Sequence, residues 1–133
     1  MLFLMEEKKE VQQTISEQKE QSSKEEFYSI LKKVSPGTSL RKALDGIISS
    51  GKGALIAIEN PMLYKVVEGG FKVNCKFSYQ RLIELSKMDG AIIISNDLRE
   101  ILLANALLTP SSKIRTLETG TRHKAAERTA KQT

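Results

Sequence analysis

The spacing of apolar residues along the chain changes abruptly near residue 26. Residues 6–26 are mostly Glu, Lys, Gln and Ser, and only Val11 and Ile15 share a helical face there. Such a segment offers too little apolar surface to pack firmly against a core. We therefore expect residues 1–26 to form a polar amino-terminal extension, either mobile or a loosely held helix.

Helical periodicity begins directly after this extension. A first helix is predicted to end at Ser35-Pro36-Gly37, because proline cannot continue a helix. Thr38 or Ser39 can cap a second helix, and Gly51 stops it. The apolar face of the first helix comprises Phe27, Tyr28, Ile30, Leu31 and Val34, and that of the second comprises Leu40, Ala43, Leu44, Ile47 and Ile48.

Short apolar runs then alternate with one further helix. Residues 53–59 and 92–94 are apolar runs that predict buried strands, and residues 101–108 predict another strand. Residues 71–77 alternate apolar and polar side chains, as a half-buried strand does. Ser78 can cap the intervening helix, which carries Leu82, Ile83, Leu85 and Met88. Strands separated by helices predict a single α/β domain with a largely buried sheet over residues 27–133.

Composition narrows the class of protein. A chain of 133 residues with 40% apolar residues suits one soluble domain, and no apolar run is long enough to span a bilayer. The single cysteine, Cys75, cannot form an internal disulfide and is predicted to be a small core residue. We therefore expect a cytoplasmic protein that does not enter the membrane.

The net charge of +5 is unevenly distributed. Residues 1–26 hold four lysines and seven acidic residues, whereas residues 113–133 hold six Lys or Arg and two Glu. A basic carboxyl-terminal region suits a phosphate-bearing ligand, although charge alone does not separate a nucleotide from a nucleic acid or an acidic partner. The other explanation of such a cluster is a solvated helix face.

Several common catalytic motifs are missing from the sequence. It contains no GxxxxGK[ST], GxGxxG or HExxH motif and no pair of cysteines. One histidine and one cysteine cannot build a His/Cys metal cage. No GxSxG element supports a serine nucleophile.

One candidate site is Asp89-Gly90-Ala91, between a predicted helix and a predicted strand. The Asp89 carboxylate could bind Mg²⁺ or Mn²⁺ together with substrate phosphates, because hard cations prefer oxygen ligands. Gly90 would let a ligand approach the backbone closely. The alternative is an ordinary turn, in which Asp-Gly is common.

A second candidate is the start of a predicted helix near the end of the chain. Thr119, Gly120 and Thr121 precede good helix formers, so free N–H groups and the positive end of the helix dipole could bind an anion. The cationic triplet of Arg122, His123 and Lys124 adds charged donors at the same point. The alternative is a normal N-cap followed by a basic surface helix.

Longer stretches of the chain resemble the diadenylate cyclase domain family, and most closely its DNA-integrity scanning branch. The resemblance covers residues 35–133, and the DGA and GTRH elements in this order, with a strand between them, are specific to that family. The matching stretches are SPGTSLRKALDGI (35–47), GALI (53–56), GGF (69–71), ELSKMDGAIIIS (84–95), AN (104–105) and ETGTRHKAAERTAKQT (118–133).

The resemblance implies a fold and a reaction. The fold would be a mixed, largely buried β-sheet flanked by helices, lacking the final strands. Two domains in a homo-oligomer would face each other, each holding one ATP. The ribose 3′-hydroxyl of each ATP would attack the α-phosphate of the other, giving cyclic di-AMP and two pyrophosphates with help from Mg²⁺ or Mn²⁺.

The resemblance also implies roles for individual residues. Asp89 would serve the metal and the attacking hydroxyl, and Gly90 would line the nucleotide. Leu108 would contact the adenine region, while Thr121, Arg122 and His123 would hold the phosphates. DNA would bind only through a carboxyl-terminal module that this sequence lacks.

The sequence departs from the family pattern at three points. Lys124 replaces an arginine and loses its planar bidentate fork, so the grip on phosphate should weaken. Ala125 stands where a threonine hydroxyl touches the nucleotide in relatives. The chain stops at Thr133, where relatives continue with further strands, so we expect a domain that is incomplete at its carboxyl end. Two alternatives to a cyclase are an impaired ATP-binding remnant and, less favoured without an aromatic stacking platform, a basic nucleic-acid-binding fragment.

Overall fold

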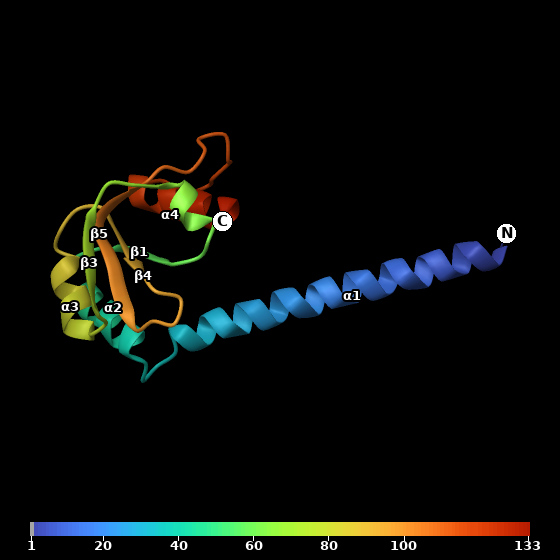
Figure 1. Cartoon of the computed structure of the whole chain (residues 1–133), viewed down its shortest axis with the longest axis horizontal. Coiled ribbons are helices and arrows are strands. Elements are labelled where there is room, and N and C mark those ends of the chain that lie inside the picture. The colour runs from blue at the N-terminus through green and yellow to red at the C-terminus, as the bar shows by residue number, and fades with distance from the viewer. Residues whose placement is uncertain (1) are drawn as a thin grey trace. The chain divides into compact units, whose positions relative to one another are not determined.

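The computed structural model describes the backbone of residues 2–133 and the side chains of residues 17–133. The helices are α1 (Leu2–Lys33), α2 (Ser39–Ser49), α3 (Tyr79–Leu85) and α4 (Thr121–Gln132), with a short 3-10 helix η1 (Leu63–Lys65) (Figure 1). The strands are β1 (Leu55–Ile58), β2 (Val67–Glu68), β3 (Phe71–Lys76), β4 (Ala91–Ile94) and β5 (Glu100–Leu108). The chain divides into two compact units, residues 1–41 and residues 42–133.

The first unit is dominated by α1, which continues without a break through the polar segment and the predicted apolar face. Of the two structures expected for residues 6–26, the helix is the observed one, in keeping with the good helix propensity of Glu, Lys and Gln. The first predicted helix is thus part of a longer one, and its apolar face lies exposed. The exposed fractions range from 43% to 62% for Phe27, Tyr28, Ile30 and Leu31.

The predicted end of this helix and the cap of the next one are confirmed. The α1 helix ends at Lys33, just before the Ser35-Pro36-Gly37 turn. The Thr38 hydroxyl accepts a hydrogen bond from the Arg41 N–H at 3.2 Å, which satisfies one N–H group in the first turn of α2.

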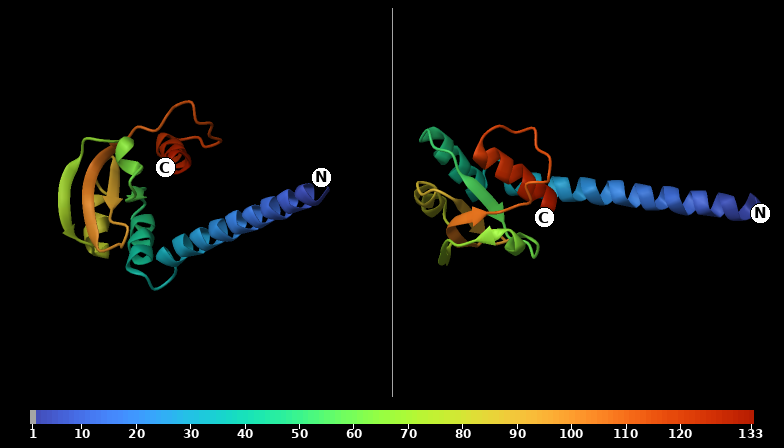
Figure 2. Two further views of the ribbon diagram at one scale, coloured as in Figure 1. Left: turned by 45° about the vertical axis from the view of Figure 1, so that its right-hand side comes forward. Right: turned by 90° about the horizontal axis from the view of Figure 1, so that it is seen from above.

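The second unit is built on a mixed β-sheet, as the family resemblance implied, with α2, α3 and α4 around it (Figure 2). β1 lies parallel to β4, with Leu55 paired to Ala91 and Ile58 paired to Ile94. β5 runs antiparallel to β4 on one side and to β2 and β3 on the other. Of the apolar runs predicted as strands, β4 and β5 therefore occupy the middle of the sheet, whereas β1 is a half-buried edge strand paired only with β4.

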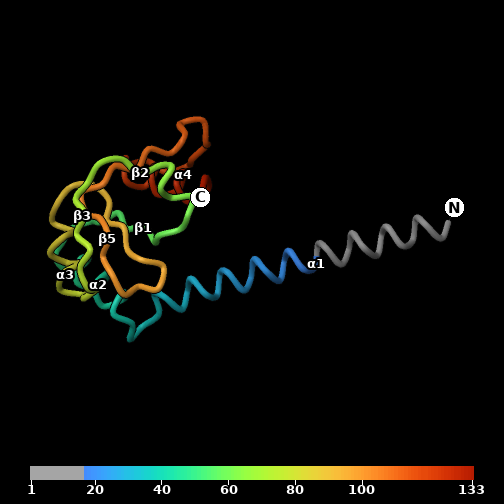
Figure 3. Tube along the Cα trace, in the orientation of Figure 1, coloured from blue at the N-terminus to red at the C-terminus, as the bar shows by residue number. Residues whose placement is uncertain are grey.

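The segment between β1 and β3, to which the hydrophobic pattern assigns no helix or strand, is not all loop. It contains η1 and the short strand β2, which pairs with the end of β5 (Figure 3). Asn60 forms the turn that leads into η1, because its side-chain Oδ1 accepts hydrogen bonds from the N–H groups of Met62 and Leu63, both at 2.9 Å. Asparagine in this position imitates a backbone turn, a local device that apolar periodicity does not register.

The core lies where β4 and β5 meet the η1 segment. Its buried residues are Leu63, Val66, Ala91, Ile93, Ala106 and Leu108. α2 contributes Ala43 and Ile47, and Leu82 of α3 is fully buried. Two apolar residues assigned to helix faces are instead largely outside the core: Ile48 is 72% exposed, and Met88 lies beyond the end of α3 and is 37% exposed.

α2 and α3 pack closely against each other. A Cβ atom at Gly46 would lie 2.5 Å from Cδ1 of Ile83, so the two helices approach through the glycine. Nearby, the Lys42 ammonium lies 4.1 Å from the centre of the Tyr79 ring, a cation–π contact. The predicted cap of α3 is also confirmed, because the Ser78 hydroxyl accepts a hydrogen bond from the Arg81 N–H at 3.2 Å. Among the described residues, no helix is long and apolar enough to cross a membrane.

Candidate nucleotide site

The parallel pairing of β1 and β4 brings two distant segments to one side of the sheet, where β1 and β4 begin. We call this row of strand ends the sheet edge. Leu55 and Ala91 are partners, so Gly53 and Asp89 each stand two residues before the first paired residue of their strands. Neighbouring strands lie about 4.8 Å apart, which places the two entry segments side by side. β5 runs the other way, with Ala106 opposite Ala91, so its last residues reach the same edge.

Asp89 lies in the turn between α3 and β4 and is exposed to solvent. Its carboxylate makes no hydrogen bond or ion pair with any part of the chain that the structure describes, so both oxygens are available to a ligand. Local sequence places Asp89 in this turn. The α3 helix ends at Leu85, and the β-branched run that begins at Ile92 favours a strand, so Asp89 lies between the two elements.

Gly90 is required by the packing of the chain itself. Its φ is +89°, and a Cβ atom there would lie 2.8 Å from the Ala106 carbonyl oxygen and 3.0 Å from Cα of Asn105. The close approach coincides with an irregularity in β5, where Asn105 adopts a φ of 54° and the register with β4 shifts. The alternative explanation, that Asp89-Gly90 is an ordinary turn, therefore holds for the glycine. It does not account for Asp89, whose exposed carboxylate has no partner among the described residues.

Leu108, the residue expected near adenine, ends β5 at the same edge but is only 8% exposed. Its side chain belongs to the core cluster with Leu63 and Val66. The following residue is also held, because the Thr109 N–H donates to the Val66 carbonyl at 2.6 Å. Leu108 thus packs mainly into the core next to the sheet edge, and only a small part of its surface could touch a ligand.

The start of α4 has a different cap from the one expected. Gly120 is the N-cap residue, with a φ of 71°, and no side chain caps the first turn. The neighbouring threonines, Thr119 and Thr121, therefore do not act as ordinary N-caps. The N–H groups of the first turn of α4 are left without a side-chain acceptor, the arrangement that favours an anion at a helix start.

The predicted phosphate ligands surround this helix start. Thr121, Arg122, His123 and Lys124 are all exposed, whereas Ala125 is half-buried against the domain. The side chains of the cationic triplet make no hydrogen bond or ion pair within the described residues. Three positive or protonatable groups thus extend from one turn of helix, together with the positive end of the helix dipole.

One contact joins this helix start to the strand entries. A Cβ atom at Gly53 would lie 2.6 Å from Nη1 of Arg122, so the guanidinium rests directly against the backbone before β1. The right-hand view of Figure 2 shows the same neighbourhood, with the beginning of α4 beside the chain that leaves α2. Since Gly53 and Asp89 occupy equivalent places before adjacent strands, the structure brings Asp89, Arg122 and the end of β5 to one edge.

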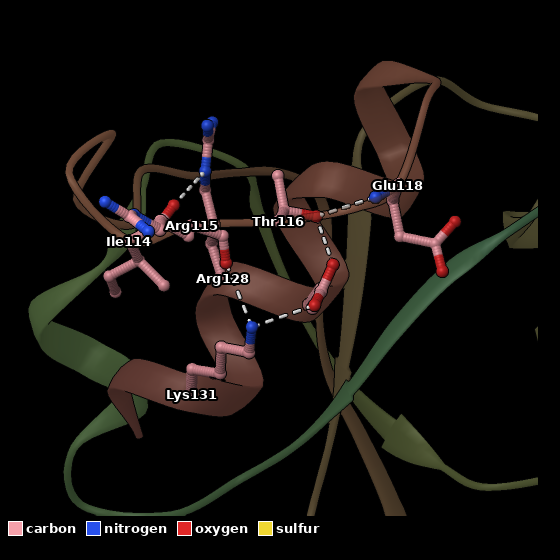
Figure 4. A network of polar contacts seen from close by, with 7 residues as sticks. Ile114, Arg115, Thr116, Glu118, Arg128 and Lys131 are labelled. Atoms are coloured by element: carbon pink, nitrogen blue, oxygen red, sulfur yellow. Dashed lines mark hydrogen bonds and ion pairs between the residues drawn. The ribbon is translucent and has the colours of Figure 1, made fainter.

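A polar network that the sequence analysis missed anchors α4 (Figure 4). Arg128 Nε donates to the Ile114 carbonyl at 3.0 Å, and Lys131 Nζ donates to the Arg115 carbonyl at 2.9 Å. The Glu127 carboxylate accepts a hydrogen bond from the Thr116 hydroxyl and pairs with Lys131 at 2.9 Å. Two of the basic residues of α4 therefore hold the preceding loop, and they are distinct from the cationic triplet.

This network also shifts a pKa. The hydrogen bond from Thr116, and secondarily the contact with Lys131, lowers the pKa of Glu127 below its ordinary value. Both interactions favour the charged carboxylate, so Glu127 is ionised at neutral pH.

The described side chains contain no group of three or more His, Cys, Asp or Glu residues that could hold a metal ion. The edge described above offers one carboxylate, Asp89. This donor set fits Mg²⁺ or Mn²⁺ only in the form in which such ions bind one or two carboxylates and complete their shell with phosphate oxygens and water.

Known proteins resemble this chain over the residues that contain the sheet and α4. The family model described as "DisA bacterial checkpoint controller nucleotide-binding" (DAC) matches residues 41–133. The chain is 48% identical over 108 residues to the DNA integrity scanning protein DisA of Symbiobacterium thermophilum, covering 80% of this chain and 31% of that protein. It is 51% identical over 110 residues to DisA of Acetivibrio thermocellus, covering 82% of this chain and 31% of that protein. The chain thus spans about a third of the length of these relatives.

A solved structure shares the fold. The crystal structure of the hypothetical membrane spanning protein from Bacillus cereus matches with a TM-score of 0.58 at 26% identity, over 70% of this chain and 48% of that one.

Proposed function

Because this chain belongs to the diadenylate cyclase (DAC) family, we propose that residues 41–133 bind ATP and supply one half of a cyclase site. Membership of this family supports nucleotidyl transfer as the general activity. The observation that carries the proposal for this chain is the meeting of an unpaired carboxylate, Asp89, with a cationic and uncapped helix start at one edge of the sheet.

The proposed reaction joins two ATP molecules held by two copies of the chain that face each other. The ribose 3′-oxygen of one ATP forms a bond to the α-phosphorus of the other, the bond from that phosphorus to the bridging oxygen breaks, and pyrophosphate leaves. The hydroxyl proton passes to solvent or a nearby base. A second, symmetrical step closes the ring of cyclic di-AMP.

The residues of this chain would act mainly by position and charge. Asp89 accepts a hydrogen bond from the 3′-hydroxyl and orients its oxygen toward the phosphorus. Arg122, His123 and Lys124, with the N–H groups of the α4 start, bind the triphosphate and stabilise the charge that grows on the pyrophosphate. A divalent ion held by Asp89 and the phosphate oxygens, Mg²⁺ or Mn²⁺, would supply further charge neutralisation. The cytoplasm, where ATP is available, is the compartment we propose.

ATP binding without turnover is a second candidate, favoured by two particular residues. Lys124 provides a point charge where relatives have a bidentate arginine, and Ala125 has no hydroxyl to offer a nucleotide. Each difference would weaken positioning of the phosphates more than it would abolish binding.

The decisive experiment incubates the purified chain with ATP and either Mg²⁺ or Mn²⁺ and measures cyclic di-AMP and pyrophosphate by chromatography. We expect product, and we expect Asp89→Asn to reduce its rate at least a hundredfold, roughly the cost of losing a key electrostatic group. Glu84→Gln is the matched control, because it neutralises another exposed carboxylate of the same segment whose ion pair with Lys87 contributes little.

The outcomes separate the candidates. ATP affinity without product supports the binding domain and refutes the cyclase for this chain. Salt-sensitive binding of DNA with no affinity for ATP would refute both and favour a nucleic-acid-binding fragment.

A further inference from the structure

Gly53 stands between α2 and β1 without a backbone reason to be glycine. Its φ lies outside the left-handed region, in contrast to Gly51 in the same connection, whose φ is +71°. An alanine could therefore adopt the conformation of residue 53 without strain. The surroundings of Gly53 explain why the residue is glycine, because another side chain already fills the space that a Cβ atom would take.

The occupant is the end of the Arg122 side chain. A Cβ atom at Gly53 would lie 2.6 Å from Nη1 and 3.8 Å from Cζ of Arg122, and it would meet no other described atom within 4 Å apart from its chain neighbours. Real Cβ contacts are essentially never as short as 2.6 Å. A methyl group there would thus displace the guanidinium and nothing else.

The guanidinium keeps its binding capacity in this position. It rests against backbone but makes no hydrogen bond or ion pair with the described residues, so its five N–H donors remain available. A free arginine side chain must give up considerable rotamer freedom when it binds a phosphate. A resting place that already holds the group at the sheet edge lowers that cost, which is the general advantage of preorganisation.

We propose that Gly53 is a positioning residue of the nucleotide site: its missing side chain forms the recess that holds the Arg122 guanidinium at the sheet edge to which Asp89 also belongs, ready for a phosphate. The register of β1 and β4 links this recess to the proposed site, because Gly53 and Asp89 lie at equivalent positions before adjacent strands. The proposal rests on the function proposed above, since it assumes that Arg122 binds the phosphates of ATP.

The first test is a double-mutant cycle on ATP affinity, measured by calorimetry with Gly53→Ala, Arg122→Ala and the double variant. We expect Gly53→Ala to weaken binding roughly three- to tenfold in the wild-type background and to leave it unchanged in the Arg122→Ala background, as coupled groups do. Thermal stability should stay the same or rise slightly, since alanine restricts the unfolded chain and only a flexible side-chain end must move.

Gly51→Ala is the matched control. Nothing lies within 4 Å of a Cβ atom at Gly51, but its positive φ makes alanine strained, so stability should fall while ATP affinity stays constant. Unchanged affinity in Gly53→Ala would overturn the proposal. An equal loss in both backgrounds would also overturn it, because the methyl group would then act through something other than Arg122.

A second measurement is independent of ATP. In the protein without nucleotide, the ¹⁵N side-chain NMR signal of Arg122, assigned by its disappearance in Arg122→Ala, should shift in Gly53→Ala and not in Gly51→Ala. An unmoved signal refutes the resting place while the cyclase proposal stands. A moved signal in a chain that fails to bind ATP refutes the proposed function and leaves the recess as a structural fact.

Discussion

At the scale of single residues, the candidate site depends on two glycines with opposite reasons for being glycine. Gly90 is needed by its own backbone, through a φ of +89° and contact with the backbone of β5. Gly53 is needed only because another side chain fills its place. The first should therefore matter for stability, and the second for ligand binding.

Gly90→Ala should destabilise the fold by about 2–4 kcal/mol, because left-handed backbone strain adds to overpacking against Asn105 and Ala106. Urea unfolding checks the value. Gly51→Ala serves as the comparison, since it has the positive φ but open space and should cost only about 1 kcal/mol. Equal losses in the two variants would show that packing at Gly90 contributes nothing.

At Lys124, a substitution is expected to strengthen ATP binding. Lys124→Arg restores a planar fork that can hold two phosphate oxygens at once, so ATP affinity should rise roughly two- to tenfold. Calorimetry with a non-hydrolysable ATP analogue measures the change. Lys113→Arg makes the same substitution outside the cationic triplet and should have no effect; a similar gain there would mean that general charge, and not geometry, sets the affinity.

At the scale of elements, α4 has two functions that lie at different places along it. Its first turn is uncapped and carries the cationic triplet. Its later turns are fastened to the preceding loop through Glu127, Arg128 and Lys131 (Figure 4). The loop and the helix thus form one anchored piece, and the direction of the helix start depends on that anchoring.

The anchoring should depend on pH through Glu127. Its pKa lies below the ordinary value of 4.5 in the folded chain, so the folded state binds this proton less tightly than the unfolded state. The stabilisation is therefore complete above about pH 4.5 and is lost as the pH falls through the folded pKa. Thermal unfolding against pH should show this loss in the wild type.

Glu127→Gln should flatten that pH dependence and increase hydrogen exchange at the Glu118 N–H, which donates to the Thr116 hydroxyl at 3.1 Å. Glu118→Gln is the control, because the Glu118 side chain is exposed and takes no part in the network. A pH dependence that persists unchanged in Glu127→Gln would contradict the assignment.

At the scale of the whole molecule, each copy supplies the proposed site with one carboxylate, Asp89, and one cationic helix start, that of α4. The proposed reaction needs a nucleophile and an electrophile on two different ATP molecules, so two copies must meet. Such an arrangement is typical of a two-fold interface, in which the same surface of each subunit faces the other.

Specific activity should consequently rise with protein concentration, in proportion to it while monomers dominate, and level off once dimers saturate. Product assays and sedimentation velocity over the same concentration series check this expectation. A specific activity that is constant where the chain is monomeric would contradict the two-copy mechanism.

The sequence alone identified most of the elements because their signals are local. The turn at Ser35-Pro36-Gly37, the caps Thr38 and Ser78, and the apolar runs of β1, β4 and β5 each depend on neighbouring residues. Asp89 and the cationic triplet were also visible, since chemistry and motif mark them. The η1 and β2 elements escaped notice, because their 60–70 segment combines turn residues with a strand too short to show a period.

Only the tertiary structure decided how these pieces meet. The register of β1 with β4 aligns Gly53 with Asp89, and the position of α4 brings Arg122 to Gly53 across more than half the chain. The Glu127 network joins residues 11 to 16 positions apart. Hydrophobic periodicity reports which face of an element is buried, but pairing register and long-range hydrogen bonds arise from packing between elements, which no local pattern encodes.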